Sequence, residues 1–437
     1  MALPRMLLDA QGRSSDGRLA PLRRYATART SPLLPGLQLT WADLHNHTVL
    51  SDGAGEPEDA YATMRAAGVD VAAVTDHAAT GRYPVHLARE DRAHVATVSS
   101  LDAARWERAA RAADAADDPE VFTALRGFEW TSPHMGHANV WLSADWVDPP
   151  GSGAHPSGRG PHGRVPPGPT MRGFHDWLLA GGPDGGVDGL LGLNHPGREG
   201  GRFEDFVLEP ALQQRLVSLE VFNRHEDYLF EGVDRGRVSP LVACLDAGWT
   251  PGLLGVSDHH DQEWGALEDA GRAGLFLPRL TRDGVRQGLL SRLFFATREA
   301  GLRLVVTAAS GEGPPVPMGA ALAHTTGTVR LRVDLDRLPA PGVDADGLRG
   351  RRVLVQVLQT GSPLPRVVAA EQLRVDGSTD PGADTVHELA VPVSAEDGDW
   401  LVVRVVDPDG RADRRASGDY RVGRALAYAA PFWLRPG

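Results

Sequence analysis

Residues 38–77 read QLTWADLHNHTVLSDGAGEPEDAYATMRAAGVDVAAVTDH, and this stretch decides the fold. Its first ten residues and residues 69–77 are short apolar runs of the kind that form buried strands. Between these runs, the apolar spacing of residues 56–68 is helical, and Gly68 can end that helix. A strand, a helix and a second strand in this order predict two parallel strands buried on both faces.

The same rhythm continues to about residue 300. Helical spacing returns in residues 100–118 and 174–182, and again before Trp249. Further strand-like runs occupy residues 121–130, 137–143, 189–195, 218–223 and 253–260. Continuous apolar strands that alternate with helices indicate the α/β class, and a TIM-like barrel is the natural closure of such a sheet. In barrels of this kind the chemistry lies at the C-terminal ends of the strands.

The sequence changes in character after Gly301. The later runs alternate apolar and polar residues and are separated by Gly, Pro and Asp turns, a pattern typical of antiparallel strands solvated on one face. We therefore predict a loosely ordered arm over residues 1–38, a barrel over residues 39–300 and a smaller antiparallel β-sandwich domain over residues 301–437. We expect the sandwich to serve packing or substrate shaping, and His324 and His387 within it to be structural or surface residues.

One segment of the predicted barrel has no regular pattern. Residues 148–169 are too rich in Pro and Gly for a helix or a strand, and we expect a long surface loop there. Such a loop can be a lid over the site or a disordered insertion. His155 and His162 within it are not predicted to be ligands.

The composition excludes several function classes. All 45 basic residues are Arg, and without Lys there is neither Schiff-base chemistry nor a Walker-A phosphate loop. The single Cys244 permits no intrachain disulfide and no thiolate metal site, so any metal must be held by imidazole and carboxylate. A net charge of -12 argues against binding to duplex nucleic acid or to an anionic membrane. With no apolar stretch of membrane-spanning length and no secretion signal, we expect a cytoplasmic location.

Side chains that bind metals are concentrated at the ends of the strand-like runs. His45 and His47 are two residues apart on a strand, so both imidazoles can face one ion. The Ser-Asp-Gly turn that follows can bring Asp52 back over the strand end. His77 ends a buried strand, where an ionisable group is costly unless it is paired or coordinated. Glu129 ends another, and a carboxylate can bridge two cations, although an Arg salt bridge is an alternative for it.

Five ordered motifs resemble those of the PHP metallohydrolases, a family named for its polymerase and histidinol-phosphatase members. The motifs are HNHTVLSDG at 45–53, TDH at 75–77, GFE at 127–129 with GHANV at 136–140, NHP at 194–196 and SDHH at 257–260. The resemblance covers about Thr40 to His260. It implies a distorted (βα)7 TIM-like PHP barrel with two or three divalent metal ions, Zn, Mn or Fe, on its C-terminal rim.

The resemblance also implies a set of ligands. His45, His47, Glu129 and Asp258 would hold one ion, Asp52, His77 and bridging Glu129 a second, and His137 and His195 a third. The family's last motif is Asp-x-His, so we expect His260 to be a ligand, although His259 stands where the family has a small residue. We expect His137 rather than the nearby His134.

The sequence motifs indicate a metal site more clearly than they indicate which bond is cleaved there. VPMG at 316–319 and AAPFWLRPG at 429–437 are similar to a branch of the family that includes carbaryl hydrolase, which cleaves carbamate or ester bonds. Most named PHP enzymes cleave phosphoesters instead, and a two-metal site suits both reactions. Arg198 and Arg224 lie near the rim and could clamp a phosphate, although surface salt bridges would also explain them. Possible shaping groups without assigned roles are Glu199, Glu220, Asn223 and His225.

The sequence therefore predicts a metal-dependent phosphoesterase that acts on a small phosphoester or short nucleotide, with a small-molecule substrate. A carbamate, ester or amide hydrolase of the carbaryl hydrolase type is the alternative among enzymes. The alternative of another class is a non-catalytic metal-binding scaffold.

Overall fold

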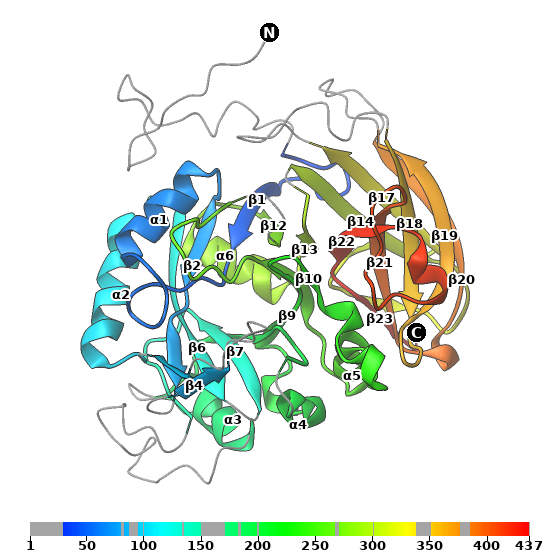
Figure 1. Ribbon diagram of the computed structural model, residues 1–437. Helices are drawn as coiled ribbons and strands as arrows, with labels where there is room; N and C mark the ends of the chain where they lie inside the picture. Colours follow the sequence, from blue (N-terminus) through cyan, green and yellow to red (C-terminus); the bar gives the residue numbers. More distant parts are fainter. Residues whose placement is uncertain are drawn as a thin grey trace.

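The computed structural model of the chain describes most of both predicted halves (Figure 1). The described residues are 29–79, 83–86, 95–98, 100–132, 135–149, 171–181, 185–198, 201–266, 271–299, 301–337, 351–375 and 385–436. Most of the predicted arm and of the Pro/Gly-rich loop, including His155 and His162, lies outside these residues. No helix within them is long and apolar enough to cross a membrane.

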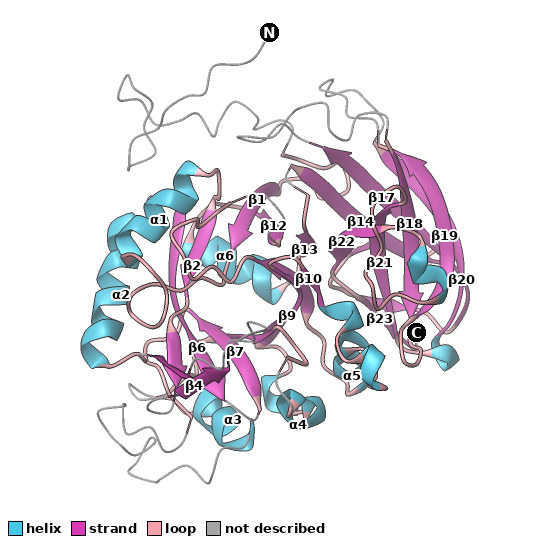
Figure 2. Cartoon of the chain, in the orientation of Figure 1, coloured by secondary structure: helices cyan, strands magenta, loops and turns pink. Residues whose placement is uncertain are grey.

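The N-terminal half alternates strands and helices, as expected for an α/β chain (Figure 2). Its strands are β1 (Gln38–Asp43), β2 (Val71–Val74), β3 (His77–Ala79), β4 (Tyr83–His86), β5 (Val95–Val98), β6 (Thr123–Ser132), β7 (Gly136–Trp141), β8 (Leu190–Asn194), β9 (Leu216–Asn223), β10 (Glu226–Asp227), β11 (Gly252–Val256), β12 (Arg272–Leu277) and β13 (Phe294–Thr297). Its helices are α1 (Pro57–Ala66), α2 (Ala103–Ala116), α3 (Met171–Leu179), α5 (Pro240–Asp246) and α6 (Arg282–Leu290), and α4 (Arg202–Phe206) is a short turn with left-handed backbone angles. Short 3₁₀ helices occupy Pro210–Leu212, Tyr228–Phe230 and Val233–Arg235 in this half, and Ala395–Asp397 and Gly418–Arg421 in the C-terminal half.

Strand pairing corrects two expectations about the barrel. β1, β2 and β6 pair in parallel, as do β8, β9 and β11, but β7 is antiparallel to both β6 and β8. Only residues 133–135 separate β6 from β7, and a parallel pair needs a crossover of a dozen or more residues. The sheet is also not closed, because β11 meets the end of β1 through one isolated bridge, Asn46 with His259, while β1 pairs along its length with antiparallel β12.

The alternation of side chains along β6 fixes which residues face the inside of this curved sheet. Phe128 and Trp130 are buried in the outer core, where Trp130 stacks on Phe174 of α3. Glu129 lies between them in the sequence and so projects from the opposite face. α1 and α2 cover the outer face of β2 and β6 and share a second core with them. The inner layer below Glu129 is apolar and includes Trp141 of β7.

The C-terminal half consists of strands joined by turns. Its strands are β14 (Leu302–Ser310), β15 (Val316–Pro317), β16 (Ala321–Ala323), β17 (Thr326–Arg337), β18 (Arg352–Gln359), β19 (Arg366–Arg374), β20 (Val386–Ser394), β21 (Trp400–Asp407), β22 (Arg424–Ala429) and β23 (Phe432–Arg435). All pairs between these strands are antiparallel except β16 with β23. β14, β15, β17 and β20 form a four-stranded sheet whose apolar side chains share a core with those of β18 and β21.

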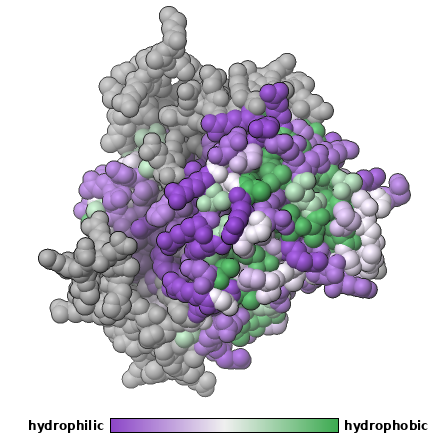
Figure 3. Space-filling model, turned by 45° about the vertical axis from the view of Figure 1, so that its right-hand side comes forward, coloured by the Kyte–Doolittle hydropathy of each residue, from purple (hydrophilic) through white to green (hydrophobic). Residues whose placement is uncertain are grey.

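The two halves are not separated at the level of the sheet. β13 of the first half pairs with β22 of the second, so the large sheet continues across the predicted boundary near residue 300. Phe222 and Tyr428 also pack together across it, with ring centroids 5.1 Å apart. The residue limits of the two domains stay predictions, while the halves themselves are joined through sheet and core. On the face drawn in Figure 3, apolar and polar side chains are interspersed.

Candidate metal centre

All nine predicted ligands come together at one end of the curved sheet. The described residues contain four groups of candidate ligands, and within each group the donor atoms lie within 4.8 Å of one another. The groups are His47, Asp52, His77 and His260; His45, His195 and Asp258; His45, His47 and Glu129; and His77, Glu129 and His137. Because four of the nine residues belong to two groups each, the groups merge into one cluster, which we call the metal centre.

The two histidines that follow β1 face each other at the buried side of the metal centre. Nε2 of His45 lies 3.1 Å from Nε2 of His47 and 3.2 Å from Oε1 of Glu129, and all three side chains are fully buried. Nε2 of His47 lies 3.2 Å from Oδ1 of Asp258. Ligands that bind one divalent ion at about 2.0–2.2 Å lie about 3.0–3.5 Å from one another, so these spacings suit a shared ion.

Glu129 stands at the middle of the metal centre. Its Oε1 lies 3.2 Å from Nε2 of His195 and 3.3 Å from Nδ1 of His137, while its Oε2 lies 2.6 Å from Nδ1 of His77. The two carboxylate oxygens therefore face different groups of histidines, which is the arrangement of a carboxylate that bridges two cations. Asn194 holds the carboxylate in place by donating from Nδ2 to Oε1 at 2.7 Å.

A turn that is held by Asp76 brings Asp52 to the metal centre. Asp76 accepts hydrogen bonds from the backbone and hydroxyl of Thr48, at 2.8 and 2.7 Å, and from the hydroxyl of Ser51, at 2.6 Å. Asp52 follows Ser51 in the sequence, and its Oδ1 lies 3.5 Å from Nε2 of His77 and 3.4 Å from Nε2 of His260. Burial raises the pKa of Asp76, and the bonds from Ser51 and Thr48 offset part of that rise. Asp76 thus braces the turn, and the cost of burying it is reduced by its three donors.

The pKa shifts show how strongly the cationic and anionic forms of these side chains depend on one another. Burial alone would lower the pKa of His45, but Asp258, Glu129 and Glu220 raise it well above its usual value. Burial would likewise raise the pKa of Glu129, yet His45 and His77 hold it well below its usual range. The carboxylates of the metal centre are therefore ionised and surrounded by groups that can supply either protons or metal-binding lone pairs.

The donor set fits divalent metal ions. Nδ1 of His47 is buried and takes part in no hydrogen bond. Burial, together with neighbouring His260 and His77, lowers the pKa of His47 to about 3, so its imidazole is neutral. Neutral imidazoles and ionised carboxylates without thiolates suit Zn, Mn and Fe. These buried His, Asp and Glu groups could hold metal ions.

Strained backbone occurs where the strands end at the metal centre. His195 after β8, Arg224 after β9 and Asp258 after β11 have φ angles of 24°, 51° and 50°. Such left-handed conformations cost about 1–3 kcal/mol each in non-glycine residues and concentrate at functional sites. The backbone of Asp258 is fixed by donation from its N–H to the carbonyl of His45.

Of the two histidines in SDHH, the structure places His260 at the metal centre. His259 belongs to none of the four groups, and its Nδ1 lies 3.3 Å from Asp261 instead. The backbone carbonyl of His259 accepts from the N–H of His47 and so joins the ends of β11 and β1. His137 is likewise at the metal centre, while His134 lies outside the described residues.

The two predicted substrate-binding arginines lie at the open edge of the metal centre. Nη1 of Arg198 is 3.6 Å and Nη2 of Arg224 is 3.9 Å from Oδ2 of Asp258. Arg224 also donates to the carbonyl of Asp258 and contacts Nδ1 of His260 at 2.8 Å. Arg198 donates to the hydroxyl of Tyr228 at 2.9 Å, a contact that no sequence motif indicated. Unlike the buried histidines, both arginine side chains are more than 40% exposed.

Glu220 is a functional candidate that sequence reasoning left without a role. It is buried in β9 and accepts from Nδ1 of His45 at 2.7 Å. Its signal in the sequence was a lone acidic residue inside the apolar run 216–223, which marks a buried carboxylate but not its partner. Of the other shaping groups, Asn223 donates to Glu220, His225 belongs to none of the ligand groups, and Glu199 lies outside the described residues.

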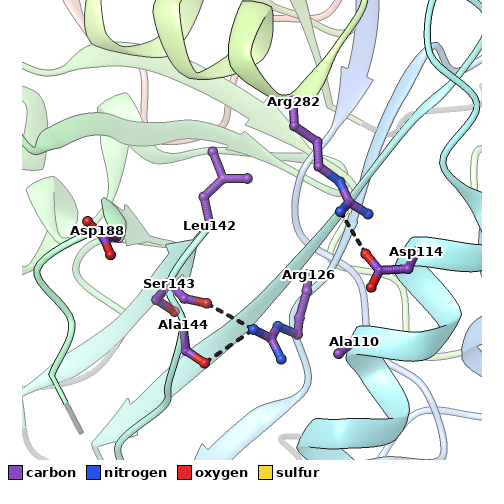
Figure 4. Close-up of a pocket in the computed structure, with 8 residues that line it drawn as sticks. All are labelled: Ala110, Asp114, Arg126, Leu142, Ser143, Ala144, Asp188 and Arg282. Atoms are coloured by element: carbon purple, nitrogen blue, oxygen red, sulfur yellow. Dashed lines mark hydrogen bonds and ion pairs between the residues drawn. The ribbon is translucent and has the colours of Figure 1, made fainter. Parts of the chain in front are cut away.

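A cavity of about 310 Å³ lies elsewhere, near the first half of β6 (Figure 4). It is lined by Ala110, Asp114, Arg126, Leu142, Ser143, Ala144, Asp188 and Arg282. Its two arginines are already engaged: Arg126 donates to the carbonyls of Ser143 and Ala144, and Arg282 pairs with Asp114. None of the nine predicted ligands lines this cavity.

Comparisons with known proteins give limited likenesses. Residues 59–142 match a family model described as a protein of unknown function, DUF3604. A search of curated proteins gives no significant match. Among solved structures, a two-domain protein from Bacteroides vulgatus, described as containing a predicted PHP-like metal-dependent phosphoesterase, is 16% identical, with 92% of this chain and 97% of that chain covered and a TM-score of 0.43.

Two further solved structures align with part of the chain. PsfC from Pseudomonas syringae is 15% identical over 58% of this chain and 88% of its own, with a TM-score of 0.30. A protein from Bifidobacterium adolescentis, described as a metal-dependent phosphoesterase by inference, is 14% identical over 57% of this chain and 95% of its own, with a TM-score of 0.30. At these values the likenesses decide neither fold nor activity, and the function has to be argued from the metal centre itself.

Proposed function

We propose that the chain is a metal-dependent phosphoesterase of the PHP type that acts on a small phosphoester or short nucleotide. The observation that carries this proposal is the convergence of nine imidazole and carboxylate side chains around Glu129, with Arg198 and Arg224 at the open edge. We further propose two or three divalent ions, Zn, Mn or Fe, held by these nine residues. The β-sandwich and the cytoplasmic location stay predictions.

The exposure of the ligands indicates where a substrate would enter. His45, His47 and Glu129 are fully buried, whereas the side chains of Asp52 and His260 are 23% and 29% exposed. A substrate would therefore approach over Asp52 and His260, beside the two arginines.

The residues of the chain would divide the chemical work. Bound divalent ions would supply an acidified water and neutralise charge on the phosphoryl group. Glu129 would hold two ion positions at a fixed separation, and Asp258 would fix the side of the site nearest the arginines. Arg198 and Arg224 would bind phosphoryl oxygens through their planar guanidinium groups. A guanidinium pair favours a phosphoester over a neutral carbamate or ester, because the latter brings no anionic group to this edge.

The test uses purified protein with Mn or Zn and a panel of p-nitrophenyl phosphate, a phosphodiester, p-nitrophenyl acetate and a carbamate. We expect turnover of phosphoesters, and loss of both bound metal and activity in the His45→Ala/His47→Ala double variant. Full phosphoester turnover by the metal-stripped double variant would contradict the proposal. Activity on carbon esters alone would favour the carbaryl hydrolase type, and bound metal without hydrolysis of any tested ester would favour a non-catalytic metal-binding scaffold.

A further inference from the structure

Glu220 lies next to the metal centre without belonging to any ligand group. Its side chain is 1% exposed and accepts three hydrogen bonds: from Nδ1 of His45 at 2.7 Å, from the backbone N–H of His195 at 2.7 Å and from Nδ2 of Asn223 at 2.9 Å. Oε1 takes the first of these and Oε2 the other two. One buried carboxylate therefore joins two candidate ligands that come from β1 and β8.

The contact with His45 decides which ring nitrogen can bind an ion. A carboxylate at Nδ1 keeps a proton on that nitrogen, because the ionised carboxylate can only accept. The other nitrogen, Nε2, is the one that faces Glu129 at 3.2 Å and Asp258 at 3.5 Å. Because Glu220 holds the proton on Nδ1, the proton that a metal ion would displace is the one on Nε2, and the Nε2 lone pair is then presented to the metal centre.

The contact with His195 acts on the backbone. His195 has a φ angle of 24°, which its neighbours have to hold against the preference of a non-glycine residue. Donation of its N–H to Glu220 ties this strained strand end to β9. The side chain of His195 then points to Glu129, with 3.2 Å between Nε2 and Oε1. Asn223 completes the site by occupying the remaining lone pair of Oε2.

We propose that Glu220 is a positioning residue that sets the tautomer of His45 and fixes the place of His195, and that it thereby raises the metal affinity of the site. This inference rests on the proposed metal-dependent function. A partner of this kind for a ligating histidine typically contributes about 10–100-fold in metal affinity. A purely structural carboxylate would contribute to folding and leave the affinity unchanged.

The test is the Glu220→Gln variant, which keeps the shape of the side chain. The amide of glutamine has one acceptor and one donor end, so it cannot accept from both His45 and the pair of donors at Oε2. We expect the affinity for Zn, measured by competition with a chromophoric chelator, to fall about 10–100-fold. We also expect a changed visible absorption spectrum of the Co-substituted protein, because the geometry of the His45 ligand is altered.

Asp334→Asn is the matched control. Asp334 is fully buried in β17 of the C-terminal half and also accepts three hydrogen bonds, from Ser31, Arg303 and Thr385. Its replacement should lower the melting temperature and leave Zn affinity and the Co spectrum unchanged. Where Glu220→Gln does not fold, ¹⁵N NMR of the imidazoles in the unaltered Zn-loaded protein replaces it, and protonated Nδ1 with coordinated Nε2 of His45 is the expected result.

The outcomes separate this inference from the proposal on which it rests. If the unaltered protein binds no metal, the proposed function fails. If the unaltered protein binds Zn and Glu220→Gln binds it equally with the same Co spectrum, or if His45 coordinates through Nδ1, the role of Glu220 is overturned while the metal site stands.

Discussion

Two buried polar clusters among the described residues differ in how their atoms meet. One is the metal centre, and the other, which we call the junction cluster, lies between the two halves and consists of Asp227, Gln356, Arg404, Tyr420 and Tyr428. In the junction cluster each contact joins a donor to an acceptor: Tyr428 donates to Asp227 at 2.9 Å, and Arg404 donates to Tyr428 at 3.1 Å and to Gln356 at 2.6 Å. The guanidinium of Arg404 also lies over the ring of Tyr420.

The metal centre is built in the opposite way. Several of its contacts bring together atoms that can carry lone pairs, such as the two Nε2 atoms of His45 and His47 at 3.1 Å, with the carboxylates of Glu129 and Asp258 beside them. Burial of such atoms is costly unless protons or cations lie between them. Burial of polar groups therefore does not by itself mark a site. The convergence of several buried carboxylates and imidazoles does.

The largest effect is expected from removing the carboxylate on which the metal centre depends. In Glu129→Gln the side chain keeps its shape but can no longer bridge two cations, so bound metal should fall by at least one ion. Phosphoesterase activity should fall on the order of a thousandfold or more, which corresponds to about 4 kcal/mol in the barrier. Metal analysis and steady-state kinetics measure this, with Glu107→Gln on the exposed face of α2 as control. Unchanged metal content in Glu129→Gln would contradict the view that the metal centre, unlike the junction cluster, is built around bound cations.

Metal removal is expected to have the next largest effect. A cation that binds only the folded chain, and whose free concentration is a thousand times its dissociation constant, stabilises the fold by about 4 kcal/mol. Chelation should therefore lower the melting temperature by several degrees, and added Mn or Zn should restore it. Calorimetry with and without chelator checks this, and equal melting temperatures under both conditions would mean that the buried acceptors are balanced without a metal.

A change in the junction cluster should affect stability alone. Tyr428→Phe removes the hydroxyl that donates to Asp227 and accepts from Arg404, leaving buried polar groups unsatisfied. We expect a loss of about 1–3 kcal/mol in unfolding free energy, measured with urea, at unchanged metal content. Loss of metal from Tyr428→Phe would show that the junction cluster is coupled to the metal centre.

The smallest expected effect is a pH dependence in the junction cluster. Burial raises the pKa of Asp227, although Arg298 and Arg404 lower it in part. Because the folded-state pKa lies above the unfolded value, the stability from this proton is fully present below about pH 3.9 and is lost as the pH rises through the raised pKa. The unfolding free energy of the unaltered protein minus that of Asp227→Asn should therefore fall with rising pH, by on the order of 1 kcal/mol. A difference that stays constant or grows would contradict this assignment.

The sequence predicted which side chains come together at the metal centre. It did not predict every backbone conformation and strand direction that brings them there. The ligands were readable because strands of one parallel sheet end on the same side, and because His, Asp and Glu are rare inside apolar runs. The choice between His259 and His260 was not readable from alternation, since the left-handed φ of Asp258 breaks the strand just before them. The antiparallel setting of β7 depends on a short connection whose length only the structure shows.

Long-range pairing was the other part beyond the sequence. β13 and β22 are more than a hundred residues apart, and no local pattern indicates that they join the two halves in one sheet. The role of Glu220 likewise depends on two contacts, with His45 and His195, that come from different strands. Local sequence patterns indicate which side chains are buried and which face of a strand they occupy. Which strands pair, and which side chains then meet across the sheet, depends on the whole fold.

Anomalous X-ray diffraction from crystals grown with excess Zn or Mn would locate the ions that the nine ligands are expected to hold. We expect at least two anomalous peaks within bonding distance of Glu129, with His45 and His47 at one of them. No peak among the nine ligands, with the side chains ordered as described, would contradict it.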